Sequence, residues 1–337
     1  MDAFWRDIGA RGAPLIEPLA DDGHALVTFL WRARDHRDRP AVITQLAPRL
    51  HGTGAAPLTH LPRSAVWYAT FRARLDLRTT YWLSVGTAAT TGTGDGWITD
   101  DKNWRADPLN PHTTPEQPPA SLLALPDSPP VRWSAAQTGA RGHVEARKIG
   151  SDILQNERNA WVYTPPGYDP TAGPNAFLLL FDSWAYANCV PTATILDNLV
   201  GAGRLPPTVA LLLGNPNAPA RQRELGCHEP FVEFVAAELL PWVRARYAVT
   251  DDPMRTVVGG SSRGALAAAF AGLRRPDLFG NVLCQSGAFW FRPDGDRSQS
   301  GLPARSRLFP ASRCGSTWTS GFSKSASRIT ARPTCSR

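Results

Sequence analysis

Short, wholly apolar runs alternate with helical segments between residues 160 and 285, and this alternation limits the chain to few folds. Phe177–Phe181 (FLLLF) and Thr208–Leu213 (TVALLL) are continuous apolar runs, as expected of strands that are buried on both faces. Pro230–Tyr247 instead places apolar residues at helical spacing. Strands that alternate with helices form a mostly parallel sheet, so the sequence predicts an α/β domain. Further strands are predicted over Ala160–Thr164, Thr256–Gly259 and Asn281–Gln285, and further helices over Val190–Ala202 and Arg263–Leu273.

The first 140 residues have a different pattern, with short β-type segments separated by turn-rich stretches. His24–Leu30, Ala65–Leu75 and Thr80–Val85 are such segments, and their spacing is typical of an antiparallel sandwich. A Pro-rich passage over 107–132 is typical of a linker or surface strap. We therefore expect three parts. These are a smaller all-β, immunoglobulin-like sandwich with its linker over 1–140, the α/β domain over 141–296, and a Ser/Arg-rich tail over 297–337.

The net charge of +7 comes from the tail alone. Residues 297–337 hold eight of the 36 basic residues and none of the 29 acidic ones, so residues 1–296 carry 28 basic and 29 acidic residues. The body of the protein has no basic excess, and we expect no nucleic-acid partner for it. No apolar run reaches the roughly 18 residues that a transmembrane helix needs. The start, MDAFWRDIGARG, lacks the apolar stretch of a secretory signal. We expect a cytoplasmic protein without a membrane partner.

The cysteines give no sign of a bound metal. There are five, at positions 189, 227, 284, 314 and 335, and they form neither a disulfide framework nor a zinc pattern. We therefore expect no metal and no cofactor. The sequence leaves the number of subunits open.

The strongest chemical motif is a G-x-S-x-G sequence at residues 260–264 (GSSRG), between the predicted strand TVVG and the predicted helix ALAAAFAGL. This strand–turn–helix setting is that of a nucleophile elbow, in which a sharp turn exposes the central serine, here Ser262. The backbone N–H of Arg263 is then one oxyanion donor. The alternative is a Gly/Ser-rich turn without catalysis. A second donor is expected from the loop after FLLLF, from the backbone of Ser183 or Trp184, unless that loop is a plain turn.

Several longer segments share a resemblance. The α/β part contains FLLLFDSWAY, LDNLVGAGRLPPTVALLL, RQRELGCHEPFVEFVAAELLPWVRARYAV, GGSSRGALAA and FGNVLCQSGAFWF. Together these resemble the enterochelin (ferric enterobactin) esterases, which belong to the esterase-D-like branch of the α/β-hydrolases. VTFLWRAR, VWYATF, DLRTTYWLSV and DPLNP look like that family's additional N-terminal sandwich. The resemblance spans about residues 5–293 and implies an α/β-hydrolase fold preceded by a sandwich.

The resemblance also implies an activity. The family hydrolyses the ester bonds of catecholate siderophores inside the cell and so frees iron, which enters only as part of the substrate. Ser262 would attack a lactone carbonyl and form an acyl-enzyme, with a histidine as base and an acidic residue to orient it. In the pattern R-x-x-E-L, Arg221 and Glu224 would lie at the substrate, because an arginine suits an anionic aromatic ligand.

Simpler roles remain open for the same residues. Arg221 or Arg223 could form an ordinary ion pair with Glu224. Trp184 and Trp290 could line an aromatic pocket or could belong to the core.

The expected triad partners are missing. In α/β-hydrolases the acid and the histidine follow the serine, but all seven histidines precede Ser262 and no Asp or Glu follows Asp296. His228, in GCHEPF, is a candidate base or simply a polar residue of the pocket or surface.

The composition of the tail favours a frameshift near codon 297 that replaces the last strands, the acid and the histidine. A functional basic tail that binds RNA or an acidic surface is the alternative. Two functions of the whole chain remain open beside siderophore hydrolysis. The chain could bind catecholates without catalysis, or it could hydrolyse other aryl or acyl esters.

Overall fold

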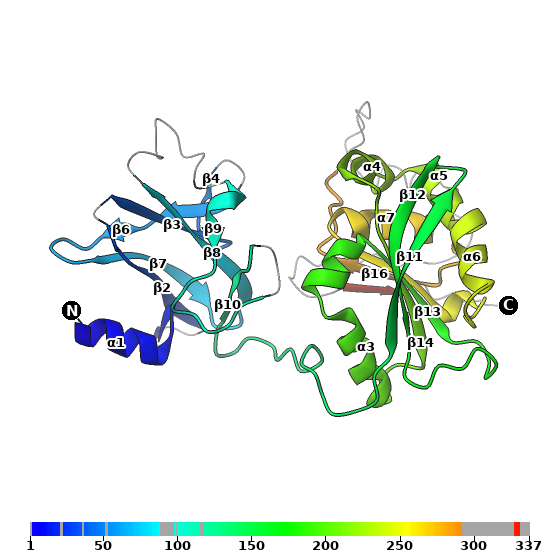
Figure 1. The fold of residues 1–337 in the computed structure, drawn as a ribbon, viewed down its shortest axis with the longest axis horizontal. Helices are drawn as coiled ribbons and strands as arrows, with labels where there is room; N and C mark the ends of the chain where they lie inside the picture. The colour runs from blue at the N-terminus through cyan, green and yellow to red at the C-terminus, as the bar shows by residue number, and fades with distance from the viewer. Residues whose placement is uncertain are drawn as a thin grey trace. The chain divides into compact units, whose positions relative to one another are not determined.

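The computed structural model describes residues 2–20, 23–35, 37–50, 53–87, 98, 100–114, 118–291 and 327–330. The chain divides into two compact units, Met1–Val131 and Arg132–Arg337 (Figure 1). Residues 107–131 of the predicted linker therefore belong to the first unit, and residues 132–140 belong to the second. Most of the predicted tail lies outside the described residues, so its frameshift origin stays a hypothesis.

The first unit is built from two antiparallel sheets, which confirms the predicted all-β fold. One sheet has the order β1-β2-β7-β6 and the other β10-β8-β3-β5-β4, with β9 beside β8. Its elements are α1 (Asp2–Arg11), β1 (Leu15–Pro18), β2 (His24–Arg32), β3 (Asp38–Thr44), β4 (Arg49–Leu50), β5 (Thr53–Pro57), β6 (Thr59–His60), β7 (Val66–Arg74), β8 (Arg78–Thr87), η1 (Asp101–Asn103), β9 (Trp104–Arg105) and β10 (Ser121–Ala124).

The core of this unit forms because β2 alternates buried and less buried residues, as a half-buried strand does. Val27 and Phe29 of β2 pack with Tyr81 and Leu83 of β8 in one cluster. The DPLNP motif contacts this core through its first residue, Asp107. The Tyr81 hydroxyl donates to Asp107 Oδ2 at 2.8 Å. Burial raises the pKa of Asp107.

The second unit contains one seven-stranded sheet with the order β11-β12-β14-β13-β15-β16-β17. β13, β14, β15 and β16 are mutually parallel, while β11 and β12 form an antiparallel hairpin at one edge. The strands are β11 (His143–Ser151), β12 (Asn156–Thr164), β13 (Ala176–Phe181), β14 (Thr208–Leu213), β15 (Thr256–Ser261), β16 (Asn281–Gln285) and β17 (Ser327–Thr330). All five predicted strands of this unit are present, and β11 was not predicted.

The far edge of the sheet carries a strand that the sequence did not predict either. β17 pairs antiparallel with β16, with Val282 opposite Ile329. The sequence led us to expect a sheet that ends at β16, whose open edge would offer unpaired backbone groups. Main-chain pairing depends little on side chains, and the segment SRIT contains two β-branched residues, which favour strands.

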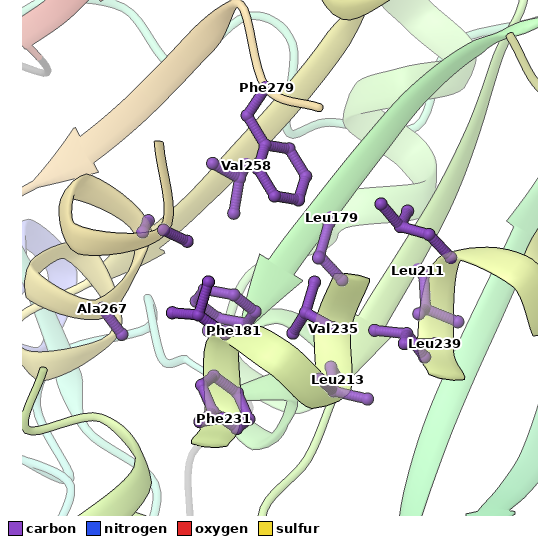
Figure 2. Close-up of a cluster of buried hydrophobic side chains, with 14 of the residues drawn as sticks. Leu179, Phe181, Leu211, Leu213, Phe231, Val235, Leu239, Val258, Ala267 and Phe279 are labelled. Atoms are coloured by element: carbon purple, nitrogen blue, oxygen red, sulfur yellow. The ribbon is translucent and has the colours of Figure 1, made fainter. Parts of the chain in front are cut away.

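Helices cover both faces of this sheet, and the strands are apolar on both sides for that reason. Leu179 and Phe181 of β13 pack with Phe231, Val235 and their neighbours in the largest core cluster, part of which Figure 2 shows. Each fully buried Leu or Phe contributes roughly 1.5–3 kcal/mol to stability. The helices are η2 (Ala185–Cys189), α3 (Thr192–Gly201), α4 (Ala218–Glu224), α5 (Glu229–Phe234), η3 (Val235–Leu239), α6 (Leu240–Arg244), η4 (Pro253–Arg255) and α7 (Arg263–Arg274).

The described residues show neither a candidate membrane span nor a candidate metal site. None of their helices is long and apolar enough to cross a membrane. They also contain no group of three or more His, Cys, Asp or Glu residues placed to hold a metal ion.

Candidate active site

The predicted site residues lie at the carboxyl ends of neighbouring parallel strands. The Asp182–Trp184 turn follows β13, α4 follows β14, and Ser262 lies directly after β15. This edge is where open α/β sheets place their ligands. The structure therefore gathers residues that are as far as 80 positions apart in the sequence.

Ser262 has the backbone of a nucleophile elbow. Its φ of 54° and ψ of −116° lie in a region that non-glycine residues rarely occupy. The Ser262 N–H donates to the carbonyl of Gln285 at 3.0 Å, and the Ser262 carbonyl accepts from the N–H of Ala288 at 3.0 Å. The last residue of β16 and the segment after it thus hold the strained turn, and α7 begins at the next residue. Strain that the surroundings maintain in this way is typical of functional sites.

The two glycines of the motif have different tasks. A Cβ atom on Gly260 would lie only 2.5 Å from the carbonyl carbon of Gly264, so the turn closes only without that atom. A Cβ atom on Gly264 would meet nothing nearer than the carbonyl oxygen of Phe181, at 3.4 Å. The first glycine is therefore a strict requirement of the elbow.

The predicted oxyanion donors come from two different turns. Ser183 and Trp184 follow β13, and Arg263 follows β15. Arg263 is the first residue of α7, so its backbone N–H belongs to the turn whose N–H groups point out of the helix. Its guanidinium lies over the ring of Phe291, 3.9 Å from the centroid. Ser183 is 3% exposed, and Trp184 is 59% exposed. Asp182, with a φ of +68°, makes the sharp turn that brings both of them after β13.

Arg221 contacts a carboxylate that the sequence did not suggest. Its Nε lies 2.9 Å from Asp182 Oδ1 and 3.0 Å from Oδ2, and its Nη2 pairs with the same carboxylate. The hydrogen bonds that Arg221 donates to Asp182 raise the pKa of Arg221. The pair joins α4 to the turn after β13 and stays partly open to solvent, with the Arg221 side chain 32% exposed. The alternative ion pair of Arg221 or Arg223 with Glu224 is wrong, because Arg221 pairs with Asp182 and Glu224 pairs with Arg158.

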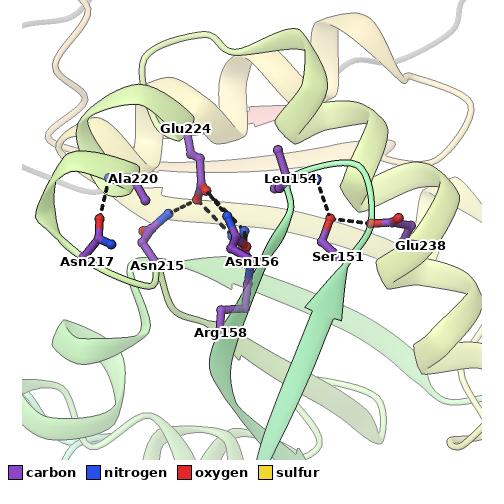
Figure 3. A network of polar contacts seen from close by, with 9 residues as sticks. All are labelled: Ser151, Leu154, Asn156, Arg158, Asn215, Asn217, Ala220, Glu224 and Glu238. Atoms are coloured by element: carbon purple, nitrogen blue, oxygen red, sulfur yellow. Dashed lines mark hydrogen bonds and ion pairs between the residues drawn. The ribbon is translucent and has the colours of Figure 1, made fainter.

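Glu224 has a structural role in place of the predicted substrate contact. Its side chain is fully buried, and Oε2 lies 2.9 Å from Nη1 of Arg158 on β12. Asn215 donates to the same carboxylate at 2.6 Å (Figure 3). A carboxylate that is enclosed in this way cannot meet a ligand. The pairing was missed because Arg158 precedes Glu224 by 66 positions on a strand of otherwise mixed character.

A tyrosine links the turn after β13 to the segment that holds Ser262. The Tyr186 hydroxyl donates to Oε1 of Gln285, and the carbonyl of Tyr186 accepts from Thr192 Oγ1 at 2.7 Å. Burial raises the pKa of Tyr186. Nothing in the sequence indicated this link, because Tyr186 resembles an ordinary core residue and Gln285 an ordinary polar residue at the end of a strand.

Both tryptophans considered for an aromatic pocket are exposed, Trp184 by 59% and Trp290 by 78%. Their assignment to the core is therefore wrong, and they remain candidates for contact with an aromatic ligand.

His228 begins α5 without a side-chain capping bond. Among the described residues its Nδ1 atom is buried with no hydrogen-bond partner. Burial, followed by the charge of Arg223, lowers the pKa of His228, so the imidazole is neutral at pH 7. The positions after Asp296 where the family's acid and histidine would lie fall outside the described residues, apart from β17.

Two family models match the chain. A model of the N-terminal domain of enterochelin esterases matches residues 26–134, and an esterase model matches residues 151–314. The second match runs past residue 296, where the predicted α/β domain ends.

Curated relatives match most of the chain. An iron(III) enterobactin esterase of Dickeya dadantii is 33% identical over 316 residues, covering 86% of this chain and 72% of that protein. An iron(III) enterobactin esterase of Yersinia enterocolitica is 30% identical, covering 80% of this chain and 86% of that protein.

Solved structures agree with these relatives. A ferric enterobactin esterase from Salmonella typhimurium has a TM-score of 0.73 and 28% identity, covering 87% of this chain and 78% of that one. An enterobactin esterase from Shigella flexneri, crystallised in the presence of enterobactin, has a TM-score of 0.70 and 27% identity, covering 90% of this chain and 80% of that one.

Proposed function

We propose an activity from one premise: the chain belongs to the enterobactin esterase family. It is a serine ester hydrolase that opens the trilactone of catecholate siderophores in the cytoplasm. The observation that carries this proposal is the backbone of Ser262, whose strained turn joins β15 to the N-terminus of α7. Such a turn presents a serine hydroxyl to a bound ester.

Ser262 is the nucleophile. Its Oγ gives up its proton and attacks the carbonyl carbon of one ester, the ester C–O bond breaks, and the released alkoxide takes up a proton in turn to become a hydroxyl group. Water then cleaves the acyl-enzyme. The backbone N–H of Arg263 and that of Ser183 or Trp184 stabilise the negative charge on the carbonyl oxygen. Because the substrate is a ring, the first attack leaves the whole opened trimer attached to Ser262.

The substrate is recognised by charge and by aromatic contact. Arg221 offers a partly exposed guanidinium at the site, and Trp184 and Trp290 offer exposed rings. A catecholate carries negative charge on an aromatic ring, so it suits both kinds of group. The iron is part of the substrate, and the reaction itself uses no cofactor.

This chain lacks the general base that Ser262 needs at the positions expected for the family. No histidine follows Ser262 and no acidic residue follows Asp296, so we propose that residues 297–337 replace the segment that carries both in the family. Without the base, acylation and hydrolysis are slow. This observation favours a second candidate function, in which the chain binds catecholate esters and does not hydrolyse them.

Hydrolysis in the presence of added imidazole separates the two functions. The 337-residue chain is mixed with enterobactin, and loss of the trilactone is followed by liquid chromatography. If Ser262 is the nucleophile, added imidazole accelerates hydrolysis, Ser262→Ala abolishes the gain, and Ser261→Ala, one residue earlier in the same motif, keeps it. If titration calorimetry shows binding while imidazole has no effect, the chain is a binder.

A further inference from the structure

Four elements of the second unit meet at one buried ion pair. The carboxylate of Glu224, at the end of α4, accepts from Nη1 of Arg158 at 2.9 Å and from Nη2 at 3.2 Å. Asn215, after β14, donates to the same carboxylate at 2.6 Å, and Asn156 on β12 holds Arg158 Nη2 at 2.7 Å. The guanidinium also lies over the ring of Phe234 from α5, at 4.5 Å. Figure 3 shows the polar contacts among Glu224, Arg158 and the two asparagines.

The position of Glu224 within its helix is electrostatically unfavourable. A helix C-terminus carries partial negative charge, which attracts cations such as Arg221 and Arg223 and repels a carboxylate. Full burial removes Glu224 from water as well. Only the opposite charge of Arg158 and the neighbouring amides offset these two costs. A glutamate at this position therefore serves the contact with Arg158 rather than the helix itself.

The helix α4 needs contacts with neighbouring elements to keep its position. It has seven residues, which is too few for a helix to be stable alone in water. The Asn217 side chain caps its first turn by accepting a hydrogen bond from the N–H of Ala220 at 2.9 Å. Its last residue, Glu224, is held by the ion pair with Arg158. Arg221 lies between these two anchors and reaches out of the helix to Asp182.

We propose that Glu224 and Arg158 are positioning residues for substrate binding. The buried pair fixes α4 on β12 and β14, and so holds the guanidinium of Arg221 beside the turn that carries Ser183 and Trp184. This inference rests on the proposed function, because it assigns Arg221 to a catecholate ligand. Neither member of the pair touches that ligand.

A double substitution separates positioning from stability. Removing one partner of a buried pair leaves an uncompensated charge and destabilises strongly, whereas replacing both by apolar residues is often neutral. Arg158→Met with Glu224→Leu therefore keeps a melting temperature near that of the unaltered chain. It loses the directional bonds to Asn215 and Asn156. We expect affinity for 2,3-dihydroxybenzoylserine, measured by titration calorimetry, to fall by about tenfold or more.

Hydrogen–deuterium exchange gives a readout that needs no ligand. Peptides that cover 182–189 and 218–226 exchange faster in the double variant, while those of the first unit do not change. Asn215→Ala, which keeps both charges of the pair and removes one amide bond to the Glu224 carboxylate, shows the same effect in weaker form should the double variant not fold. Tyr81→Phe in the first unit is the control, since it lowers stability without touching α4.

The outcomes are distinct. Unchanged exchange and unchanged affinity in a folded double variant would overturn the inference, because the pair would then be structural only. Failure of the unaltered chain to bind the probe would overturn the proposed function, while the exchange result would still decide whether the pair holds α4.

Discussion

A single methyl group at Gly260 should disrupt the elbow. In Gly260→Ala the new Cβ would lie 2.5 Å from the carbonyl carbon, 2.6 Å from the oxygen and 2.9 Å from the Cα of Gly264. All three are backbone atoms, and an ordinary contact needs 3.4 Å or more. No side chain can rotate away, so β15 and α7 must separate by close to an ångström.

The cost follows from the packing around this contact. Gly260 and Gly264 are both buried, and α7 is buried along most of its length. Overpacking of such a site costs about 1–3 kcal/mol, and a backbone-to-backbone clash belongs at the upper end of that range. We expect the free energy of unfolding of the second unit to fall by about 3 kcal/mol. For a unit of this size the melting temperature then falls by roughly 6–12 °C.

Urea and thermal unfolding, followed by circular dichroism, measure the loss. Gly264→Ala is the matched control from the same motif. Its Cβ meets nothing nearer than 3.4 Å, and alanine is the better helix former by about 1 kcal/mol, so it should be neutral or slightly stabilising. Equal losses in the two variants would refute the reasoning, and so would a Gly260→Ala protein as stable as the unaltered chain.

Three further predictions concern other positions. Ser262→Gly should increase the free energy of unfolding by about 1 kcal/mol, and so raise the melting temperature, because glycine relieves the strained φ and ψ of residue 262. Ser262→Ala should give no such increase, and thermal unfolding of the two variants measures the difference. The pKa of His228 is lowered below its ordinary 6.5, so the stability it contributes is present above pH 6.5 and is lost as the pH falls through the lowered value. His228→Asn should weaken that dependence in urea titrations and add about 1 kcal/mol by capping α5. Tyr81→Phe should cost about 1–3 kcal/mol, measured by thermal unfolding of the first unit, because Asp107 loses its buried donor.

The periodicity of apolar residues and the context of the G-x-S-x-G motif could predict the strands and the turn that position the site. The apolar runs of β13 and β14 are long and unbroken because helices cover both of their faces, and that pattern is visible in the sequence. The elbow was predictable for a similar reason, since its glycines and its flanking elements are local. Ser262 could thus be placed between a strand and a helix without coordinates.

The partners across the sheet could not be predicted. Asp182 and Arg221 are 39 positions apart, and Arg158 and Glu224 are 66 apart; nothing local in the sequence indicates which carboxylate each arginine meets. β11 was missed because most of its residues are exposed, so it lacks the alternation that identifies a half-buried strand. The exposure of Trp184 and Trp290 depends on tertiary packing, which residue type alone does not reveal.

A mass measurement tests the role of Ser262 most directly. With no histidine after Ser262 to activate water, the acyl-enzyme should persist once imidazole-assisted acylation has occurred and the imidazole has been removed. Intact mass spectrometry after incubation with enterobactin should then show one adduct with the mass of a whole opened trimer. Peptide mapping should place it on Ser262, and Ser262→Ala should lack it. An adduct on Ser261 or elsewhere, or trilactone hydrolysis that continues unchanged in Ser262→Ala, would contradict the account.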